Sequence, residues 1–288
     1  MRTPRLLEEA SLHRFLPNIL TILGLCAGMT AIRFATLGRW EAAVVAIAIA
    51  AVIDALDGGL ARLLNAQSKF GAQLDSLSDV ISFGVAPALI NYLWTLQDIR
   101  GLGWVSALVL TVCAALRLAR FNTRSVEADL PPWAKRFFTG VPVPAGAGLA
   151  LMPILISLLI GEELAGTDHM VVRAWLGVYP YITTVWLIII GGLMISRLPT
   201  FSIKDIRISH RMVLPVLVGA GLLAAAMATA PWLTLILCGL AYTASLPFSY
   251  HHFRKLQARE AGNGADIAPL HLAPVQTLAE EDGEHPGH

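Results

Sequence analysis

The stretch Asp-Ala-Leu-Asp-Gly-Gly-Leu-Ala-Arg occupies residues 54–62, and Gly71, Asp75 and Asp79 follow it in the next apolar region. Together these residues place four carboxylates, Asp54, Asp57, Asp75 and Asp79, in a part of the chain that is otherwise built for lipid. A carboxylate near the centre of a bilayer costs about 2.5 to 3.5 kcal/mol on insertion scales, so four together require a polar cavity or bound cations. The stretch therefore predicts a functional site inside a membrane protein.

The composition of the chain supports a membrane environment. Of the 288 residues, 56% are hydrophobic and 14% are charged, and the mean hydropathy is +0.64. A soluble domain needs more polar groups than this to cover its surface, so the composition indicates an integral membrane protein. The formal net charge of +1 argues against nucleic acid as a partner, since that requires a concentrated basic surface.

Apolar stretches long enough to cross about 30 Å of hydrocarbon predict an all-α polytopic membrane bundle of about eight transmembrane helices. Residues 1–15 are expected to form a short N-terminal interfacial helix, followed by a transmembrane domain over 16–252. A disordered cytoplasmic tail is expected over 256–288, where Ala, Glu, Gly and Pro are frequent. The eight spans are expected near residues 16–36, 40–65, 69–97, 102–121, 142–161, 175–196, 212–229 and 232–250.

Basic residues are distributed unevenly between the two ends of the predicted spans. If both termini are cytoplasmic, 17 of the 21 Lys and Arg residues fall on the cytoplasmic side. The other four are Arg33, Arg39, Arg100 and Arg173. Because cytoplasmic loops carry an excess of Lys and Arg, this asymmetry predicts cytoplasmic termini, an even number of spans and a site that opens to the cytoplasm.

Helical spacing predicts that the four aspartates form one site. Asp54 and Asp57 are three residues apart, and Asp75 and Asp79 are four apart, so each pair projects from one face of its helix. The short connection between the two spans predicts an antiparallel hairpin in which the pairs face each other. Carboxylates without His or Cys partners suit hard cations, which favours Mg²⁺ or Mn²⁺, with two ions rather than one.

Residues that follow the second aspartate indicate the class of ligand. Gly58, Gly59 and Ala61 leave room for a bulky group to approach the backbone. Arg62 supplies a charge and a fork of donors suited to phosphate. The expected ligand is a phosphate ester held through metal ions. A cation transporter is the alternative from another class, but the chain has no second copy of the acidic stretch, whereas transporters usually contain internal repeats.

The same residues carry a resemblance to a known family. The chain is similar to the CDP-alcohol phosphotransferase signature Asp-x2-Asp-Gly-x2-Ala-Arg-x8-Gly-x3-Asp-x3-Asp at Asp54, Asp57, Gly58, Ala61, Arg62, Gly71, Asp75 and Asp79. The resemblance implies that the four aspartates coordinate a metal pair and that Asp79 is the catalytic base. It also implies a set of residues that bind the CDP group: Asn18, Thr21, Asp54, Asp57, Gly58, Ala61, Arg62 and Gly71.

Less specific motifs indicate which reaction of the family to expect. Similarity to the bacterial, membrane-embedded members of the family that make phosphatidylserine is carried by residues 17–21, 75–88, 116–122, 138–145, 193–197 and 201–204. It implies transfer of the phosphatidyl group of CDP-diacylglycerol to L-serine, with release of CMP, by a homodimer in the bacterial cytoplasmic (inner) membrane. Glycerol 3-phosphate and an inositol phosphate remain alternative acceptors. A phosphorylated acceptor would demand an additional arginine-rich clamp near Asp79.

The acceptor pocket is indicated by fewer residues. L-serine is a zwitterion, so its site needs a cation or donors for the carboxylate and acceptors for the ammonium. Ser82 lies one turn beyond Asp79 on the same face, and Arg120 and Asn122 lie at a cytoplasmic helix end. These three are the expected acceptor-binding residues. Arg117 and Arg120 also fit ordinary positive-inside residues.

Overall fold

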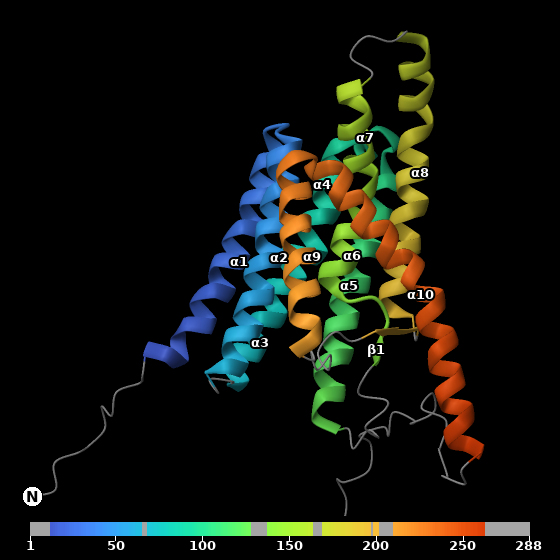
Figure 1. Ribbon diagram of the computed structural model, residues 1–288. Helices are drawn as coiled ribbons and strands as arrows, with labels where there is room; N and C mark the ends of the chain where they lie inside the picture. Colours follow the sequence, from blue (N-terminus) through green and yellow to red (C-terminus); the bar gives the residue numbers. More distant parts are fainter. Residues whose placement is uncertain are drawn as a thin grey trace, which may run out of the picture.

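The computed structural model describes residues 12–64, 68–127, 137–163, 169–196, 198–201 and 210–262. Long helices make up most of these residues and run side by side (Figure 1), which confirms the predicted all-α bundle. The helices are α1 (Leu12–Thr36), α2 (Trp40–Leu63), α3 (Lys69–Asp79), the π-helix η1 (Val80–Val85), α4 (Ala86–Trp94), the 3₁₀ helix η2 (Leu96–Ile99), α5 (Gly101–Glu127), α6 (Val143–Ala150), α7 (Met152–Glu163), α8 (His169–Ile195), α9 (His210–Thr229) and α10 (Pro231–Gly262). Two short strands that the sequence did not predict, β1 (Phe137–Thr139) and β2 (Pro199–Phe201), pair antiparallel with Phe138 opposite Thr200.

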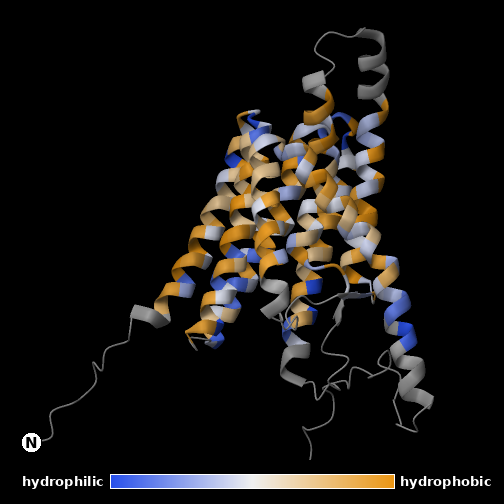
Figure 2. Ribbon diagram, viewed as in Figure 1, coloured by the Kyte–Doolittle hydropathy of each residue, from blue (hydrophilic) through white to orange (hydrophobic). Residues whose placement is uncertain are grey.

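Seven stretches among the described residues are long and apolar enough to cross a membrane. In Figure 2 apolar residues cover most of the length of the bundle, and hydrophilic residues gather towards the helix ends. The seven are Phe15–Thr36, Trp40–Leu63, Lys69–Trp94, Gly101–Thr123, Val143–Ile160, Val178–Ile195 and Pro231–His252. The remaining predicted span, 212–229, corresponds to α9, whose apolar part, Leu214–Thr229, is shorter. At 1.5 Å per residue it reaches about 24 Å of the roughly 30 Å hydrocarbon core.

Two expected boundaries differ from the structure. α1 begins at Leu12, so residues 12–15 of the expected interfacial helix belong to the first transmembrane helix, and residues 1–11 lie outside the described part. α10 continues to Gly262, beyond the expected start of the tail at residue 256. Lys, Gln, Arg, Glu and Ala follow there, and all are good helix formers, so the helix outlasts its apolar section. The rest of the expected tail, 263–288, lies outside the described residues.

α1 and α2 form a helical pair joined by a short turn. Gly38 ends α1 with a φ of +70°, and its N–H donates to the Ala35 carbonyl over 3.0 Å. Only glycine adopts such a φ without steric cost, so the turn can be this tight. Small buried residues, among them Ala31 and Ala43, let the two helices approach closely. This pair supplies one wall of the site described below.

The third span changes helix type directly after Asp79. There α3 gives way to η1, and at the end of η1 the Ala86 N–H bonds to the Ile81 carbonyl, which is the five-residue spacing of a π-helix. Pro87 lies in the first turn of α4. Because proline has no N–H, it cannot bond the carbonyl four residues earlier, and its ring pushes that turn open. The widened turn therefore directly follows the expected catalytic base.

Two segments that carry the family resemblance, 138–145 and 193–197, meet at the end of the bundle where β1 lies in Figure 1. The Gly140 N–H donates to the Leu198 carbonyl over 2.8 Å. Gly140 has a φ of +77°, and a Cβ on it would lie 2.5 Å from the Met194 carbonyl oxygen. The backbone therefore requires glycine at this crossing. The crossing fixes the end of α8 against the start of α6.

Candidate metal centre

Three of the four predicted aspartates converge between α2 and α3. One carboxylate oxygen each of Asp54, Asp57 and Asp75 lies within 4.8 Å of the other two. Asp57 is buried, whereas Asp54 and Asp75 are half-buried. Because the ligand atoms are all carboxylate oxygens, the group fits a hard divalent cation such as Mg²⁺ or Mn²⁺. The hairpin of the second and third spans thus brings the two acidic pairs together.

The fourth aspartate, Asp79, lies beside this group. Its carboxyl group is in hydrogen-bonding contact with Asp54, and it also interacts electrostatically with Asp75 and Asp57. Four carboxylates at short range repel one another when ionised, and a bound cation relieves that repulsion. A metal role for Asp79 stays a prediction, whereas its place next to the three-aspartate group is the geometry that a base beside a metal site requires.

Asp57 is held in place from two sides. The Thr21 hydroxyl of α1 donates a 2.7 Å hydrogen bond to its Oδ2, and the Gly58 N–H donates to the same carboxylate. Thr21 is buried, so this bond is shielded from water. Hydrogen bonds to an ionised acceptor are about twice as strong as neutral ones. Thr21, expected in the CDP-binding set, therefore orients one of the three clustered carboxylates.

Two further residues of the expected CDP-binding set lie together between α1 and α3. Ser68 caps α3 by accepting a 2.9 Å hydrogen bond from the Gly71 N–H. A Cβ on Gly71 would lie 2.8 Å from Oδ1 of Asn18, so the absence of a side chain lets α1 and α3 approach. The structure therefore brings Asn18 and Gly71 side by side, and their role in CDP binding stays a prediction.

The end of α2 leaves open space next to Asp57. No atom lies within 4 Å of a Cβ placed on Gly58 or on Gly59. Arg62 is exposed and follows Gly58 by four residues, so both lie on the same side of the helix. Ala61 is half-buried and adds little volume. A bulky anionic ligand would find room beside Gly58. The Arg62 guanidinium, one turn further along α2, would supply positive charge to it.

The three expected acceptor-binding residues have partners within the protein. Ser82 is 1% exposed, and its hydroxyl donates to a carbonyl of α1 over 3.4 Å. Asn122 donates to Oγ of Ser76 over 2.9 Å, and Arg120 donates to the Ile195 carbonyl over 3.3 Å. These contacts join η1 to α1, and α5 to α3 and α8, so helix packing accounts for them. Their role in acceptor binding stays a prediction.

The sequence did not indicate Tyr242 as a site residue, and it indicated Arg117 only as a basic residue of the kind found at cytoplasmic helix ends. Arg117 on α5 interacts electrostatically with Tyr242 on α10 and with Asp79. Its Nε and the Tyr242 hydroxyl are buried and have no hydrogen-bond partner among the described residues. No spacing rule links these positions, because α5 and α10 are far apart in the chain.

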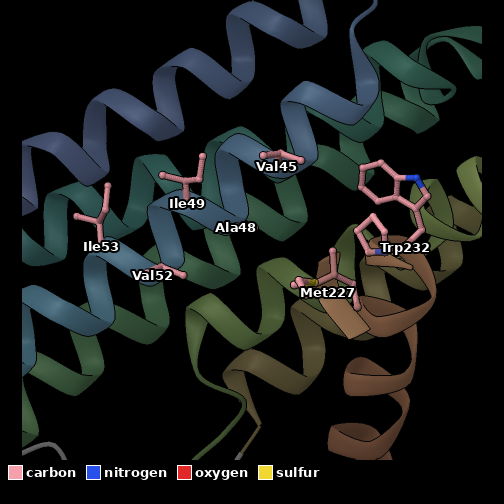
Figure 3. A pocket seen from close by; sticks show the side chains of 9 residues that line it. Val45, Ala48, Ile49, Val52, Ile53, Met227 and Trp232 are labelled. Atoms are coloured by element: carbon pink, nitrogen blue, oxygen red, sulfur yellow. The ribbon is translucent and has the colours of Figure 1, made fainter. Parts of the chain in front are cut away.

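An apolar pocket of about 370 Å³ lies on another face of α2. Figure 3 shows its α2 residues opposite Met227 and Trp232 of α9 and α10. Ile53, which directly precedes Asp54, lies at one end of this lining. The lining residues are Val45, Ala48, Ile49, Val52, Ile53, Met227, Pro231, Trp232 and Leu235.

The fold and the site define a polytopic membrane protein with a cluster of oxygen ligands beside a surface free of side chains. The CDP-alcohol phosphatidyltransferase family model matches residues 14–186, and the model for CDP-alcohol phosphatidyltransferase 2 matches residues 211–247. The chain therefore belongs to the CDP-alcohol phosphatidyltransferase family.

Curated relatives from several bacteria are similar to this chain over most of their own length. A protein of Mycobacterium leprae (strain TN) is 36% identical over 245 residues, which cover 85% of this chain and 77% of the relative. One from Helicobacter pylori (strain J99) is 30% identical, over 70% of this chain and 78% of the relative. One from Bacillus subtilis (strain 168) is 34% identical, over 50% of this chain and 81% of the relative. All three are named CDP-diacylglycerol-serine O-phosphatidyltransferase.

Proposed function

We propose that this protein is a phosphatidylserine synthase, which transfers the phosphatidyl group of CDP-diacylglycerol to the hydroxyl of L-serine and releases CMP. The observation that carries the proposal is the convergence of Asp54, Asp57 and Asp75 next to Asp79, which is the arrangement that the family signature implies. The shared name of relatives that cover most of the chain supports L-serine as the acceptor.

The donor headgroup is proposed to lie along the end of α2. Gly58 and Gly59 leave open space there, and the Arg62 guanidinium provides a fork of donors for phosphate oxygens. Asn18 and Gly71, which lie side by side between α1 and α3, are proposed to contact the same headgroup. In this proposal the pyrophosphate lies near the three aspartates, whose negative charge would repel it. A cation between the two sets of anions is therefore required.

An acyl chain of the donor is proposed to occupy the apolar pocket of α2. The pocket begins at Ile53, next to Asp54, and extends along α2 to Val45, about 12 Å at 1.5 Å per residue. The pocket and the aspartates lie on different faces of α2 at a similar depth, so a lipid whose headgroup lies at the aspartates would pass a chain around the helix to enter this end. The lining is almost entirely hydrocarbon, which suits an acyl chain and excludes a charged ligand.

The chemistry is a displacement at the lipid-linked phosphorus. The serine oxygen forms the new bond to phosphorus, the bond from phosphorus to the CMP oxygen breaks, and CMP leaves with that electron pair. Asp79 accepts the proton of the serine hydroxyl as the new bond forms. Bound Mg²⁺ or Mn²⁺, two ions in our proposal, would supply positive charge for the pyrophosphate and the leaving group. Asp54, Asp57 and Asp75 would hold the ions, and Thr21 orients Asp57.

The placement in the cell is proposed from charge. The excess of Lys and Arg at one end of the spans supports both termini and the site on the cytoplasmic side of a bacterial inner membrane. In the structure, Arg62, Lys69 and Arg120 belong to the helix ends on that same side as the aspartates. The homodimer stays a prediction, to be tested by the mass of the purified protein in lipid nanodiscs.

One assay tests the proposed function against its rivals. The purified full-length protein is given CDP-diacylglycerol and Mn²⁺ with L-serine, glycerol 3-phosphate or an inositol phosphate in separate reactions, and CMP release is measured. We expect CMP release with L-serine and with neither of the phosphorylated acceptors. Excess EDTA should abolish this release, and added Mg²⁺ or Mn²⁺ should restore it. Release with a phosphorylated acceptor only would assign a different reaction to the same site. Full turnover in EDTA would contradict the metal assignment.

A further inference from the structure

We infer that Arg117 and Tyr242 form the pocket that binds the carboxylate of the amino acid acceptor. The inference rests on the proposed function and names residues for a part of the site that the sequence assigned to Ser82, Arg120 and Asn122. It begins from two polar atoms that the fold leaves without partners, the Arg117 Nε and the Tyr242 hydroxyl.

The two atoms need a ligand on physical grounds. Nearly all buried polar groups in proteins are hydrogen-bonded, because an unpaired one retains its full desolvation cost. Both atoms are buried without a hydrogen-bond partner among the described residues, and both are donors. A guanidinium and a phenol close enough to interact electrostatically, each with an unpaired donor, call for an anionic acceptor. A carboxylate has two oxygens, one for each donor.

Arg117 also lies near Asp79, the expected catalytic base. Arg117 interacts electrostatically with both Tyr242 and Asp79, so groups from α5, α10 and α3 lie near one another in the bundle. Neither a hydrogen bond nor an ion pair joins Arg117 to Asp79 among the described residues. A small molecule that carries a hydroxyl and a carboxylate on one short carbon chain can bridge them. Its hydroxyl then lies at Asp79, which takes the proton.

The charge of the pocket favours a carboxylate over a phosphate. Arg117 provides one positive charge, and Tyr242 provides a neutral donor. A carboxylate carries a single negative charge, whereas a phosphate monoester near neutral pH carries up to two and needs a larger basic clamp. Arg120, about one turn further along α5, donates to a carbonyl of α8. The pocket therefore suits an amino acid better than glycerol 3-phosphate.

Three variants of the full-length protein test this pocket: Arg117→Gln, Tyr242→Phe and the control Tyr250→Phe. The control removes a hydroxyl from an exposed tyrosine of the same helix. CMP release is measured with L-serine and with serinol, which replaces the carboxylate by a hydroxymethyl group and keeps the reacting hydroxyl and the ammonium. Loss of a hydrogen bond to a charged group corresponds to roughly a tenfold change in equilibrium.

We expect the KM for L-serine to rise about tenfold or more in Arg117→Gln and about threefold to tenfold in Tyr242→Phe, with the KM for CDP-diacylglycerol unchanged. The preference for L-serine over serinol should fall by the same factors. A variant that is merely misfolded would lose both acceptors equally. Tyr250→Phe should behave as wild type.

Two results overturn the inference. If the wild type uses L-serine and neither variant changes its preference over serinol, the carboxylate lies elsewhere while the proposed function stands. If the wild type releases CMP with glycerol 3-phosphate only, and Arg117→Gln loses that activity, the pocket holds a phosphate and both proposals fail. The isosteric Tyr242→Phe keeps the test decisive even if Arg117→Gln proves unstable.

Discussion

The Thr21 hydroxyl of α1 donates a 2.7 Å hydrogen bond to the Asp57 carboxylate of α2, and both side chains are buried. The bond is a link between the first span and the metal centre. A buried carboxylate without such a donor would be free to turn away from Asp54 and Asp75. The acidic hairpin of α2 and α3 therefore depends on α1 for the orientation of one of its ligands.

Thr21→Val should weaken cation binding. Valine keeps the shape of threonine and removes the donor, and a hydrogen bond to a charged group is worth about 1.5 to 3 kcal/mol, so we expect the Mn²⁺ concentration for half-maximal activity to rise about tenfold or more. Thr21→Ser should restore most of the affinity. Thr30→Val is the matched control, because Thr30 is an exposed residue of α1 whose hydroxyl bonds only to its own helix. Equal metal curves for Thr21→Val and the control would remove Thr21 from the site.

Substitution of Asp75 should affect metal binding, and substitution of Asp79 should affect turnover. Asp75→Asn removes one of the three clustered ligands and should lower Mn²⁺ affinity, measured directly by calorimetry on the protein in nanodiscs. Asp79→Asn should keep appreciable binding of CDP-diacylglycerol and lose CMP release by about a hundredfold or more, since general-base catalysis contributes about 10² to 10⁴. An Asp79→Asn protein within about threefold of wild-type turnover would show that another group takes the proton.

The hairpin of aspartates was predictable because it depends on local rules. Spacings of three and four residues define a helix face, and a short connection between two apolar spans makes them antiparallel neighbours. Asp54, Asp57 and Asp75 accordingly meet in the structure. The limit of these rules is visible at Asp79. Its residue type and spacing match those of the other three, but the way it contacts Asp54 depends on how α2 and α3 are rotated against each other.

The contacts between distant helices were not predictable. Apolar periodicity says that α5 and α10 are buried, but not which turn of one faces which turn of the other, so the approach of Arg117 to Tyr242 left no sequence signal. Ser82 shows the converse. It shares a helix face with Asp79 by ordinary α-helical counting, but the π-helical turn from Val80 onward changes the register. Its hydroxyl donates to α1.

Gly140→Ala should destabilise the fold. Its φ of +77° places it in the left-handed region, which costs other residues roughly 1 to 2 kcal/mol, and the new Cβ would meet the Met194 carbonyl. We expect the apparent Tm in detergent to fall by several degrees. Gly148→Ala is the control, because Gly148 lies on an exposed face of α6 with open space around it, and alanine there should be neutral or stabilising. A Tm for Gly140→Ala at or above that of wild type would contradict the backbone argument.

Ala48→Trp should block the proposed acyl-chain pocket. Ala48 lines the pocket of about 370 Å³ between Val45 and Ile53, and an indole there would project into it and obstruct it. We expect the KM to rise for long-chain CDP-diacylglycerol and to change little for a donor with short acyl chains. Ala224→Trp, on the exposed surface of α9, controls for the added bulk. If both donors respond alike, the chain lies outside this pocket.

Gly58→Leu should abolish donor binding while the carboxylates remain. No atom lies within 4 Å of a Cβ at this position, so the helix accepts the leucine without a clash, but its side chain would occupy the space proposed for the CDP group. We expect affinity for CDP-diacylglycerol to fall at least about tenfold, the loss that about 1.4 kcal/mol of steric conflict produces. Calorimetric Mn²⁺ binding should stay close to that of wild type, because Asp54, Asp57 and Asp75 are unchanged. Gly192→Leu is the matched control, since Gly192 is an exposed glycine of α8 that also has open space around it. A Gly58→Leu protein that binds CDP-diacylglycerol like this control would place the donor on another face of the bundle.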